Sequence, residues 1–183
     1  EEALRQAIRT APRGSSGAGS GWLIEHVKGT ALNDTGCMEL FRAALNVIAR
    51  GDLHADVAKA LGSSTLVALS KPDGGVRPIA IGEVLARVAG RAACVQLRKP
   101  LDTFFAPNQF GVMARGGSEQ ILHTITAHLA QNPGDVLVSL DTSNAFNSVS
   151  RAAMLKALLT APDSIRALFP LSLIHISEPT RRS

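Results

Sequence analysis

The sequence contains no tyrosine, one tryptophan and two cysteines. Cys37 and Cys94 lack the Cys-x-x-Cys spacing of zinc and redox motifs, so we expect two reduced thiols in the core and no disulfide. His123 and His128 are five positions apart rather than four, which argues against a zinc pair on one helix face. No apolar run approaches the ~20 residues of a membrane span, so no membrane partner is expected. No glycine pair is followed by Lys-Ser/Thr, which excludes a phosphate loop.

The remaining composition is that of a globular protein. The 183 residues are 45% hydrophobic and 19% charged, which is enough apolar surface for a core in one domain or one and a half. The net charge of +4 and the pI of about 9.6 fit a polyanionic partner without proving one.

Hydrophobic periodicity and turn residues predict an α+β fold. Gly51 and Pro100 are expected to end helices, Ser118 and Ser150 to begin them. Residues 10–21 and 101–114 read as loops. The expected helices lie at 1–9, 22–28, 38–50, 53–61, 83–99, 119–131 and 150–159. The expected strands lie at 65–69, 76–81 and 136–140. The apolar face of the helix at 119–131, formed by Ile121, Leu122, Ile125 and Leu129, is expected to point inward.

The strands at 65–69 and 76–81 flank the turn Lys71-Pro72-Asp73-Gly74-Gly75, which predicts a β-hairpin. Lys71 and Arg77 place one cation on each arm. Such a hairpin could close over phosphates, because Arg offers a bidentate fork and Lys a point charge. The alternative is an exposed hairpin with ordinary surface cations.

A second cationic group lies on the helix expected at 83–99, where Arg87, Arg91 and Arg98 form one stripe. They could form a solvated face or hold template phosphates without sequence preference. The Gly/Ser-rich stretch 10–21 could be a flexible linker or a tight loop at a template groove.

Asp141 follows the apolar run 136–140, and Phe146 comes five residues later. A carboxylate at the end of a buried strand suits a hard cation such as Mg²⁺, and the backbone carbonyl of Leu140 could add a second oxygen. A lone Asp in this place can also be a turn former or a cap. Phe146 could equally be a core aromatic.

Several of these segments, in this order, resemble reverse transcriptases of the non-LTR retrotransposon and group II intron type. The resemblance covers residues 15 to 160. It rests on segments that match family motifs: Gly17-Ala18-Gly19-Ser20-Gly21-Trp22, Lys71–Ile79, Gly82–Arg87, Gln109-Phe110-Gly111-Val112 with Gly116-Gly117-Ser118, and Val136–Asn147.

The resemblance implies an RNA-directed DNA polymerase that extends a DNA primer with dNTPs on an RNA template. It implies that Lys71 and Arg77 contact the phosphates of the incoming nucleotide, and that Phe146 is the gate beneath its sugar. Asp141 would be the first metal-binding aspartate of a site for two Mg²⁺ (or Mn²⁺) ions. A further implication is a template contact by Gln109, Phe110 and Gly111, to which Arg87 and Arg91 could add.

On this reading the chain divides into an upstream segment (1–13), a fingers-like region (14–135), the start of a palm (136–170) and a tail (171–183). The tail from Leu171 to Arg181 resembles a translated sequencing adaptor, so we exclude it from the fold. The chain begins at Glu1 without Met, which suggests a fragment.

The sequence also departs from the family pattern. It has no Asp-Asp pair and no Gln-Gly motif between carboxylate sites. One aspartate cannot hold two metal ions in catalytic geometry, so we expect the chain by itself to be inactive. The alternatives are a non-catalytic nucleic-acid-binding remnant of a decayed element, a group II intron maturase, or a structural helical domain. An intracellular location, in nucleus or cytoplasm, is expected. The oligomeric state is not indicated.

Overall fold

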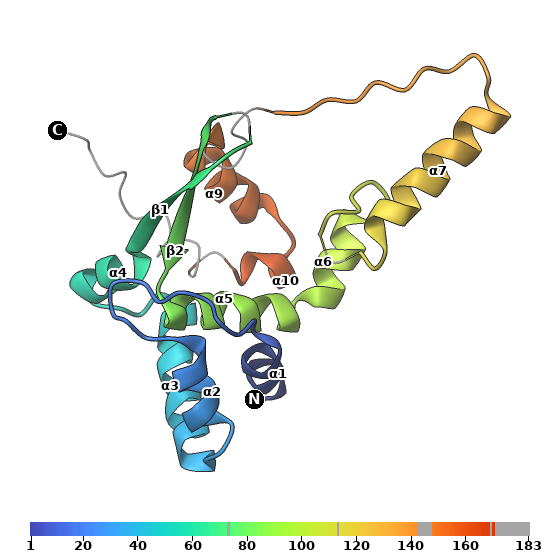
Figure 1. Ribbon diagram of the computed structural model, residues 1–183. Helices are drawn as coiled ribbons and strands as arrows, with labels where there is room; N and C mark the ends of the chain where they lie inside the picture. The colour runs from blue at the N-terminus through green and yellow to red at the C-terminus, as the bar shows by residue number, and fades with distance from the viewer. Residues whose placement is uncertain (73, 113, 143–147, 169, 171–183) are drawn as a thin grey trace. The chain divides into compact units, whose positions relative to one another are not determined.

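The computed structural model describes residues 1–72, 74–112, 114–142, 148–168 and 170. The chain forms two compact units, the first made of residues 1–96 and 166 onward and the second of residues 97–165. Helices dominate both, and a two-stranded antiparallel sheet lies in the first unit (Figure 1). This mixture agrees with the expected α+β class. No helix in the described part of the chain is long and apolar enough to cross a membrane.

The core of the first unit is formed by α1 (Glu2–Thr10), α2 (Ile24–Ala31), α3 (Thr35–Arg50) and α5 (Val84–Gln96). Helix α1 packs along α5, and α2 packs against α3. The buried core side chains are Leu4, Ile8, Ala11, Ile24, Val27, Ala31, Met38, Leu45, Ile48, Val84, Val88 and Ala89. Burying these apolar groups is the main force that holds the unit together.

Local capping explains the bounds of α3. The carboxylate of Asp34 accepts a hydrogen bond from the backbone N–H of Cys37 at 2.7 Å, so the helix begins at Thr35 and not at Met38 as expected. It ends at Gly51, as predicted, where φ is 72°. That left-handed conformation favours glycine. The helix α4 (Ala55–Gly62) then leads to the sheet.

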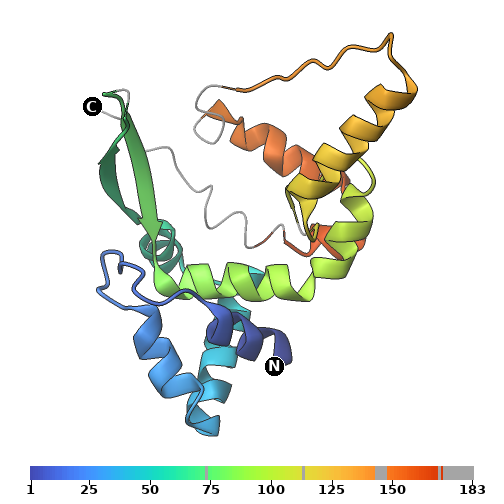
Figure 2. The ribbon, with the colours of Figure 1, turned by 45° about the vertical axis from the view of Figure 1, so that its right-hand side comes forward.

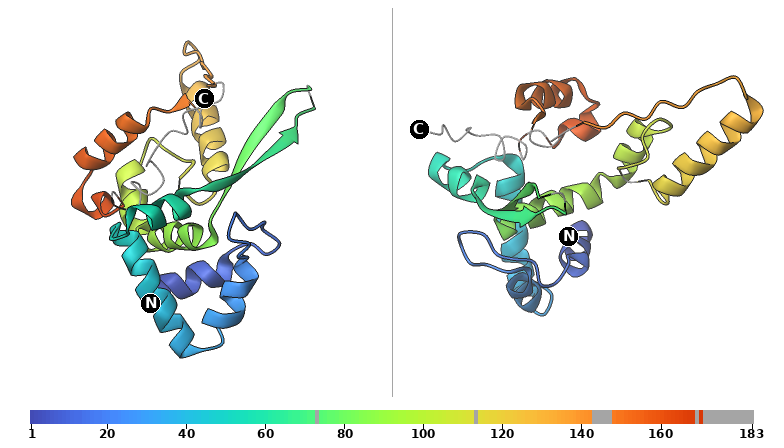
Figure 3. Two further views of the ribbon diagram at one scale, coloured as in Figure 1. Left: turned by 90° about the vertical axis from the view of Figure 1, so that its left-hand side faces the viewer. Right: turned by 45° about the horizontal axis from the view of Figure 1, so that its top comes forward.

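The predicted hairpin is confirmed as β1 (Ser64–Ser70) and β2 (Val76–Gly82). The register pairs Ser64 with Gly82 and Ser70 with Val76. The hairpin projects from the helices of its unit (Figure 3). Most of its residues are accordingly exposed, and its hydrophobic side chains have little cover.

The long helix expected at 83–99 is shorter than predicted. Helix α5 ends at Gln96, and a new helix, α6 (Arg98–Phe105), begins after Leu97. Pro100 therefore lies in the first turn of α6 instead of ending a helix. A proline is tolerated there because the first backbone N–H groups of a helix have no partner within it. The expected loop at 101–114 is correspondingly helical as far as Phe105.

The second unit contains α6, α7 (Gly117–Gln131) and α9 (Arg151–Thr160), and α10 (Asp163–Arg166) follows. The predicted cap at Ser150 is confirmed, because its hydroxyl accepts from the N–H of Ala153 at 3.2 Å. The predicted cap at Ser118 is wrong, since the left-handed Gly116 precedes α7.

Two expectations about burial need correction. On the apolar face of α7, Ile121 and Leu122 are 41% and 64% exposed, while Ile125 and Leu129 are half-buried. Cys94, expected in the core, is exposed, and Cys37 is half-buried; both are free thiols. Ile125 and Leu129 line a pocket together with residues 134–137, whereas Ile121 and Leu122 face solvent.

The strand predicted at residues 136–140 is absent from the structure. This segment has no regular secondary structure, and Val136 and Leu140 are 85% and 90% exposed. A strand requires a neighbour that pairs with its backbone N–H and C=O groups. No described segment pairs with residues 136–140, so their apolar sequence does not form a strand here.

Candidate nucleotide and nucleic-acid site

The tip of the hairpin carries the two cations singled out from the sequence. Arg77 pairs with Leu69 across the sheet, and Lys71 donates its backbone N–H to the carbonyl of Gly75 at 2.7 Å. Strand β1 ends at Ser70, and within it Leu69 lies opposite Arg77. If the alternation of side chains is continued to Lys71, the next residue, it lies on the same face as Leu69 and Arg77. Lys71 and Arg77 are diagonal neighbours, a relation that typically separates the backbones by about 7–8 Å. Both cations can therefore reach one polyanion.

The turn that holds this pair is tight. Gly74 donates its N–H to the carbonyl of Lys71 at 3.1 Å and has a φ of 80°, which glycine adopts without strain. Arg77 is exposed and Lys71 is half-buried. Neither cation has a carboxylate partner within 4 Å among the described residues. Their charges are thus available to a ligand.

Arg87 and Arg91 on α5 contact the N-terminal segment instead of forming a free stripe. Arg87 donates to the backbone carbonyl of Ser16 at 3.0 Å. Arg91 donates to the carbonyl and hydroxyl oxygens of Thr10 at 2.9 and 3.1 Å. Each guanidinium has five N–H donors, so these bonds leave donors for a phosphate. The predicted template contact remains an expectation.

The Gly/Ser-rich stretch between α1 and α2 is a hydrogen-bonded loop, which favours the tight-loop interpretation over a linker. Its path along the start of α5 is visible in Figure 2. Glu83, directly after β2, is buried and accepts from the N–H and the hydroxyl of Ser20 at 3.0 and 2.5 Å. At the other end, Glu25 accepts from the N–H of Gly14 at 2.7 Å, and this bond holds the pKa of Glu25 below its usual value.

Close packing within the loop adds to these bonds. A Cβ atom at Gly17 would lie 2.8 Å from the carbonyl oxygen of Trp22, so glycine is required there. Glu83, directly before α5, and Arg87 in its first turn are four residues apart, and so are their partners Ser20 and Ser16. The start of α5 therefore fixes the loop at two matched points.

The expected template residues 109–111 form a separate turn in the second unit. The side-chain oxygen of Gln109 accepts from the N–H groups of Gly111 and Val112, the latter at 3.0 Å. Phe110 is half-buried and Gly111 is exposed. The turn is thus preformed, although its contact with a template stays a prediction.

Asp141 is exposed in the extended segment of the second unit, and its Oδ1 accepts from the N–H of Thr142 at 2.9 Å. This local bond fits the turn-forming interpretation and leaves the second carboxylate oxygen for a cation. Together with the Leu140 carbonyl, Asp141 offers part of a Mg²⁺ ligand set, which needs six oxygens. Phe146 lies outside the described residues.

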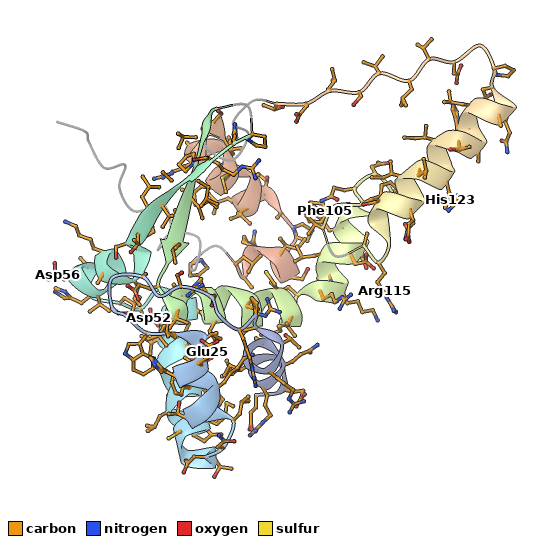
Figure 4. All side chains as sticks on the ribbon, in the orientation of Figure 1. Glu25, Asp52, Asp56, Phe105, Arg115 and His123 are labelled. Atoms are coloured by element: carbon orange, nitrogen blue, oxygen red, sulfur yellow. The ribbon has the colours of Figure 1, made fainter. Side chains whose placement is uncertain are left out.

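The described residues contain no group of three or more His, Cys, Asp or Glu side chains that could hold a metal ion. Glu25, Asp52 and Asp56 of the first unit lie on different elements (Figure 4). His123 and His128 both lie on α7, and His128 contacts the carboxylate of Asp135 at 2.7 Å.

Sequence reasoning missed the roles of Glu83 and Ser20. Glu83 was expected to begin a helix, and no residue near it in the sequence indicated that its carboxylate would be buried. The detectable signal was indirect, because a Gly-rich loop that is not a linker needs side-chain acceptors for its N–H groups. The partner lies 63 positions away in the sequence, beyond any local pattern.

No protein-family model matches the chain. The chain is similar to the Retrotransposable element SLACS 132 kDa protein of Trypanosoma brucei gambiense, with 31% identity over 158 residues. The alignment covers 86% of this chain and 13% of that protein. The sequence is thus related to one stretch of a retrotransposable element protein and spans about an eighth of its length.

Proposed function

We propose that the chain is the nucleotide-binding part of an RNA-directed DNA polymerase from a mobile element. The similarity to a retrotransposable element protein supports the mobile-element origin. The hairpin supports the nucleotide-binding role, because Arg77 lies opposite Leu69 and the alternation of side chains, continued to Lys71, puts both cations on one face beside a tight turn. This shared face is the observation that carries the proposal.

In this proposal the hairpin binds the triphosphate of an incoming dNTP. Arg77 donates two parallel hydrogen bonds to phosphate oxygens, and Lys71 neutralises a further charge. Among the residues that the structure describes, no carboxylate lies within 4 Å of either cation, so binding breaks no ion pair there. The anchored loop at residues 11–23 would contact the RNA template, and so would the turn at residues 109–112.

Asp141, with the carbonyl of Leu140, would hold one metal ion close to the primer end. When bound, Mg²⁺ lowers the pKa of the primer hydroxyl and neutralises charge on the phosphates. The chain has no Asp-Asp pair to complete a two-metal site. We therefore expect nucleotide binding but no primer extension by this chain alone, and robust extension with Mg²⁺ would contradict that expectation.

Titration with Mg²⁺-dTTP and Mg²⁺-dTMP by calorimetry tests the binding role. We expect dTTP to bind more tightly, because the hairpin recognises the phosphates and not the base. Lys71→Ala and Arg77→Ala should each weaken dTTP binding by about 1.5–3 kcal/mol, the typical net worth of a hydrogen bond to a charged group. Lys156→Ala on α9 removes an equal charge from an exposed helix and is the matched control.

Arg77→Lys should lose part of the affinity, because a single point charge replaces a bidentate fork. Equal affinities for wild type, Lys71→Ala and Arg77→Ala would overturn the binding role. If Lys156→Ala also weakened dTTP binding, the loss in the hairpin variants would be explained by the change in net charge alone. The alternative, a non-catalytic nucleic-acid-binding remnant of a decayed element, predicts oligonucleotide binding with no preference for dTTP over dTMP.

A further inference from the structure

Beside the base of the hairpin lies a cavity of about 360 Å³, a size in the lower part of the range for small-ligand pockets, about 300–1,000 Å³. It belongs to the first unit and is lined by residues from three places in the sequence. The loop contributes Gly19, Ser20 and Trp22, the end of α4 contributes Ala60, Leu61 and Ser63, and the start of α5 contributes Glu83 and Leu85.

Trp22 gives this cavity an exposed aromatic wall. Its side chain is 43% exposed, although a large apolar ring usually seeks cover. Phe41 and His26 hold the indole, with ring centroids at 6.3 Å and interplanar angles of 66° and 90°. Both contacts are edge-type, so no ring of the described residues is stacked parallel to the indole. An aromatic ring held by its edges can receive a flat ligand.

The polar groups of the cavity are already engaged. Glu83 accepts two hydrogen bonds from Ser20, and the hydroxyl of Ser20 also accepts from the N–H of Trp22 at 3.3 Å. The hydroxyl of Ser63 donates to the carbonyl of Ala60 at 2.7 Å. A ligand would therefore be bound mainly by apolar contacts with its flat faces, and less by hydrogen bonds to the polar groups at its edge.

We propose that this cavity receives one unpaired nucleobase of a single-stranded nucleic acid, stacked on Trp22. Every base has a flat π-face, so stacking on an aromatic side chain tolerates any sequence. The net charge of +4 favours a polyanion over a neutral aromatic ligand. The engaged Glu83 places a negative charge inside the cavity, which excludes the phosphate and admits the base. The inference deepens the proposed function by naming a template subsite, and it rests on that function.

The loop is held in the shape that this subsite needs. Glu83 fixes Ser20, two residues before Trp22, and Gly17 packs against the carbonyl of Trp22. The indole is thus positioned by bonds to the helix that begins at the base of the hairpin. Glu83 acts as a positioning residue. Its carboxylate oxygens accept hydrogen bonds from Ser20 and so order the loop, and they are not needed to bind the base.

The chain contains a single tryptophan, so its fluorescence reports on this cavity alone. The experiment titrates the protein with single-stranded oligonucleotides of adenine or uracil and with an abasic oligonucleotide of equal length and charge. Stacked bases are expected to quench the indole emission, with little difference between adenine and uracil. The abasic oligonucleotide is expected to bind more weakly and to leave the emission unchanged.

Binding of a labelled oligonucleotide, followed by anisotropy, gives the variant test. Trp22→Ala should weaken binding roughly 5- to 150-fold, the span observed for removal of a stacking aromatic, whereas Trp22→Phe should keep most of the affinity. Circular dichroism melting of both variants checks the fold. Equal quenching by the abasic oligonucleotide, or equal affinity of folded Trp22→Ala and wild type, would overturn the proposal.

The double variant Lys71→Ala/Arg77→Ala separates this subsite from the nucleotide-binding hairpin. We expect it to lose dTTP affinity and to retain quenching by oligonucleotides. If wild type binds dTTP through the hairpin but no base quenches Trp22, the subsite alone is wrong. If quenching occurs while dTTP does not bind, the polymerase proposal fails and the stacking site stands.

Discussion

At the scale of the residue, a buried carboxylate decides how the N-terminal loop folds. Glu83 is 7% exposed and receives both the N–H and the hydroxyl of Ser20. A carboxylate in this position is stable only while those donors are present, because an unpaired buried charge is costly. The sequence could not reveal this pair, since the two residues are 63 positions apart.

Glu83→Ala tests this anchoring. The substitution leaves the Ser20 donors without an acceptor, so it should reduce the free energy of unfolding by about 1–3 kcal/mol. Ser20→Ala keeps the backbone N–H donor and should cost about 0.5–1.5 kcal/mol. Urea unfolding measures both changes, and trypsin cleavage after Arg13 should become faster in Glu83→Ala. An unchanged midpoint together with unchanged cleavage would show that the loop does not depend on Glu83.

A second residue-scale prediction concerns Gly117, the first residue of α7. A Cβ atom there would overlap the carbonyl oxygen of Phe110. Gly117→Ala should therefore force the turn at residues 109–112 away from α7 and destabilise the protein by about 1–3 kcal/mol, as overpacking does.

Gly134→Ala is the matched control, because nothing lies within 4 Å of a Cβ at that position. Its effect should stay within about 0.5 kcal/mol, as for most surface substitutions. Thermal unfolding followed by circular dichroism compares the two variants. Similar midpoints for Gly117→Ala and Gly134→Ala would refute the close contact with Phe110.

At the scale of the element, the sequence predicted what depends on neighbours in the chain. The hairpin follows from alternation and from the turn at residues 71–75, and α3 ends at Gly51 because glycine adopts the left-handed conformation. The break at Leu97 was missed because Pro100 can both end a helix and occupy the first turn of one. The residues around Pro100 are compatible with a helix that ends there and with a helix that begins there, so the local sequence does not distinguish the two.

The segment at residues 136–140 shows what the sequence could not supply. Its apolar run suits a buried strand, but a strand depends on a distant partner. The candidate site also combines local and distant contacts. The cations of the hairpin were predictable from the turn. The hydrogen bonds of Arg87 to Ser16 and of Arg91 to Thr10 were not, because the partners are 71 and 81 positions apart in the sequence.

Hydrogen exchange distinguishes these two elements. The cross-strand amides of β1 and β2 should exchange slowly relative to those of residues 136–140, which have no backbone partner in the described chain. Unprotected amides exchange at the rate of an open chain. Mass spectrometry of short peptides from each segment measures the difference. Strong protection of residues 136–140 would mean that this segment pairs with a partner after all.

At the scale of the whole molecule, the proposed binding groups divide between the two compact units. The first unit supplies the hairpin cations and the anchored loop with Trp22, and the second supplies the turn at Gln109 and the carboxylate of Asp141. The first unit has the larger buried core and the longer-range hydrogen bonds. The binding functions of the first unit can therefore be tested without reference to the second.

A double-mutant cycle on the hairpin tests the nucleotide-binding proposal most directly. Affinities for Mg²⁺-dTTP are measured for wild type, Lys71→Ala, Arg77→Ala and the double variant at fixed ionic strength. If both cations hold the same triphosphate, the two losses are not additive, with a coupling energy of at least about 0.5 kcal/mol that is absent for dTMP. Additive effects, or no effect of either substitution on dTTP binding, would contradict the proposal that this face of the hairpin binds the incoming nucleotide.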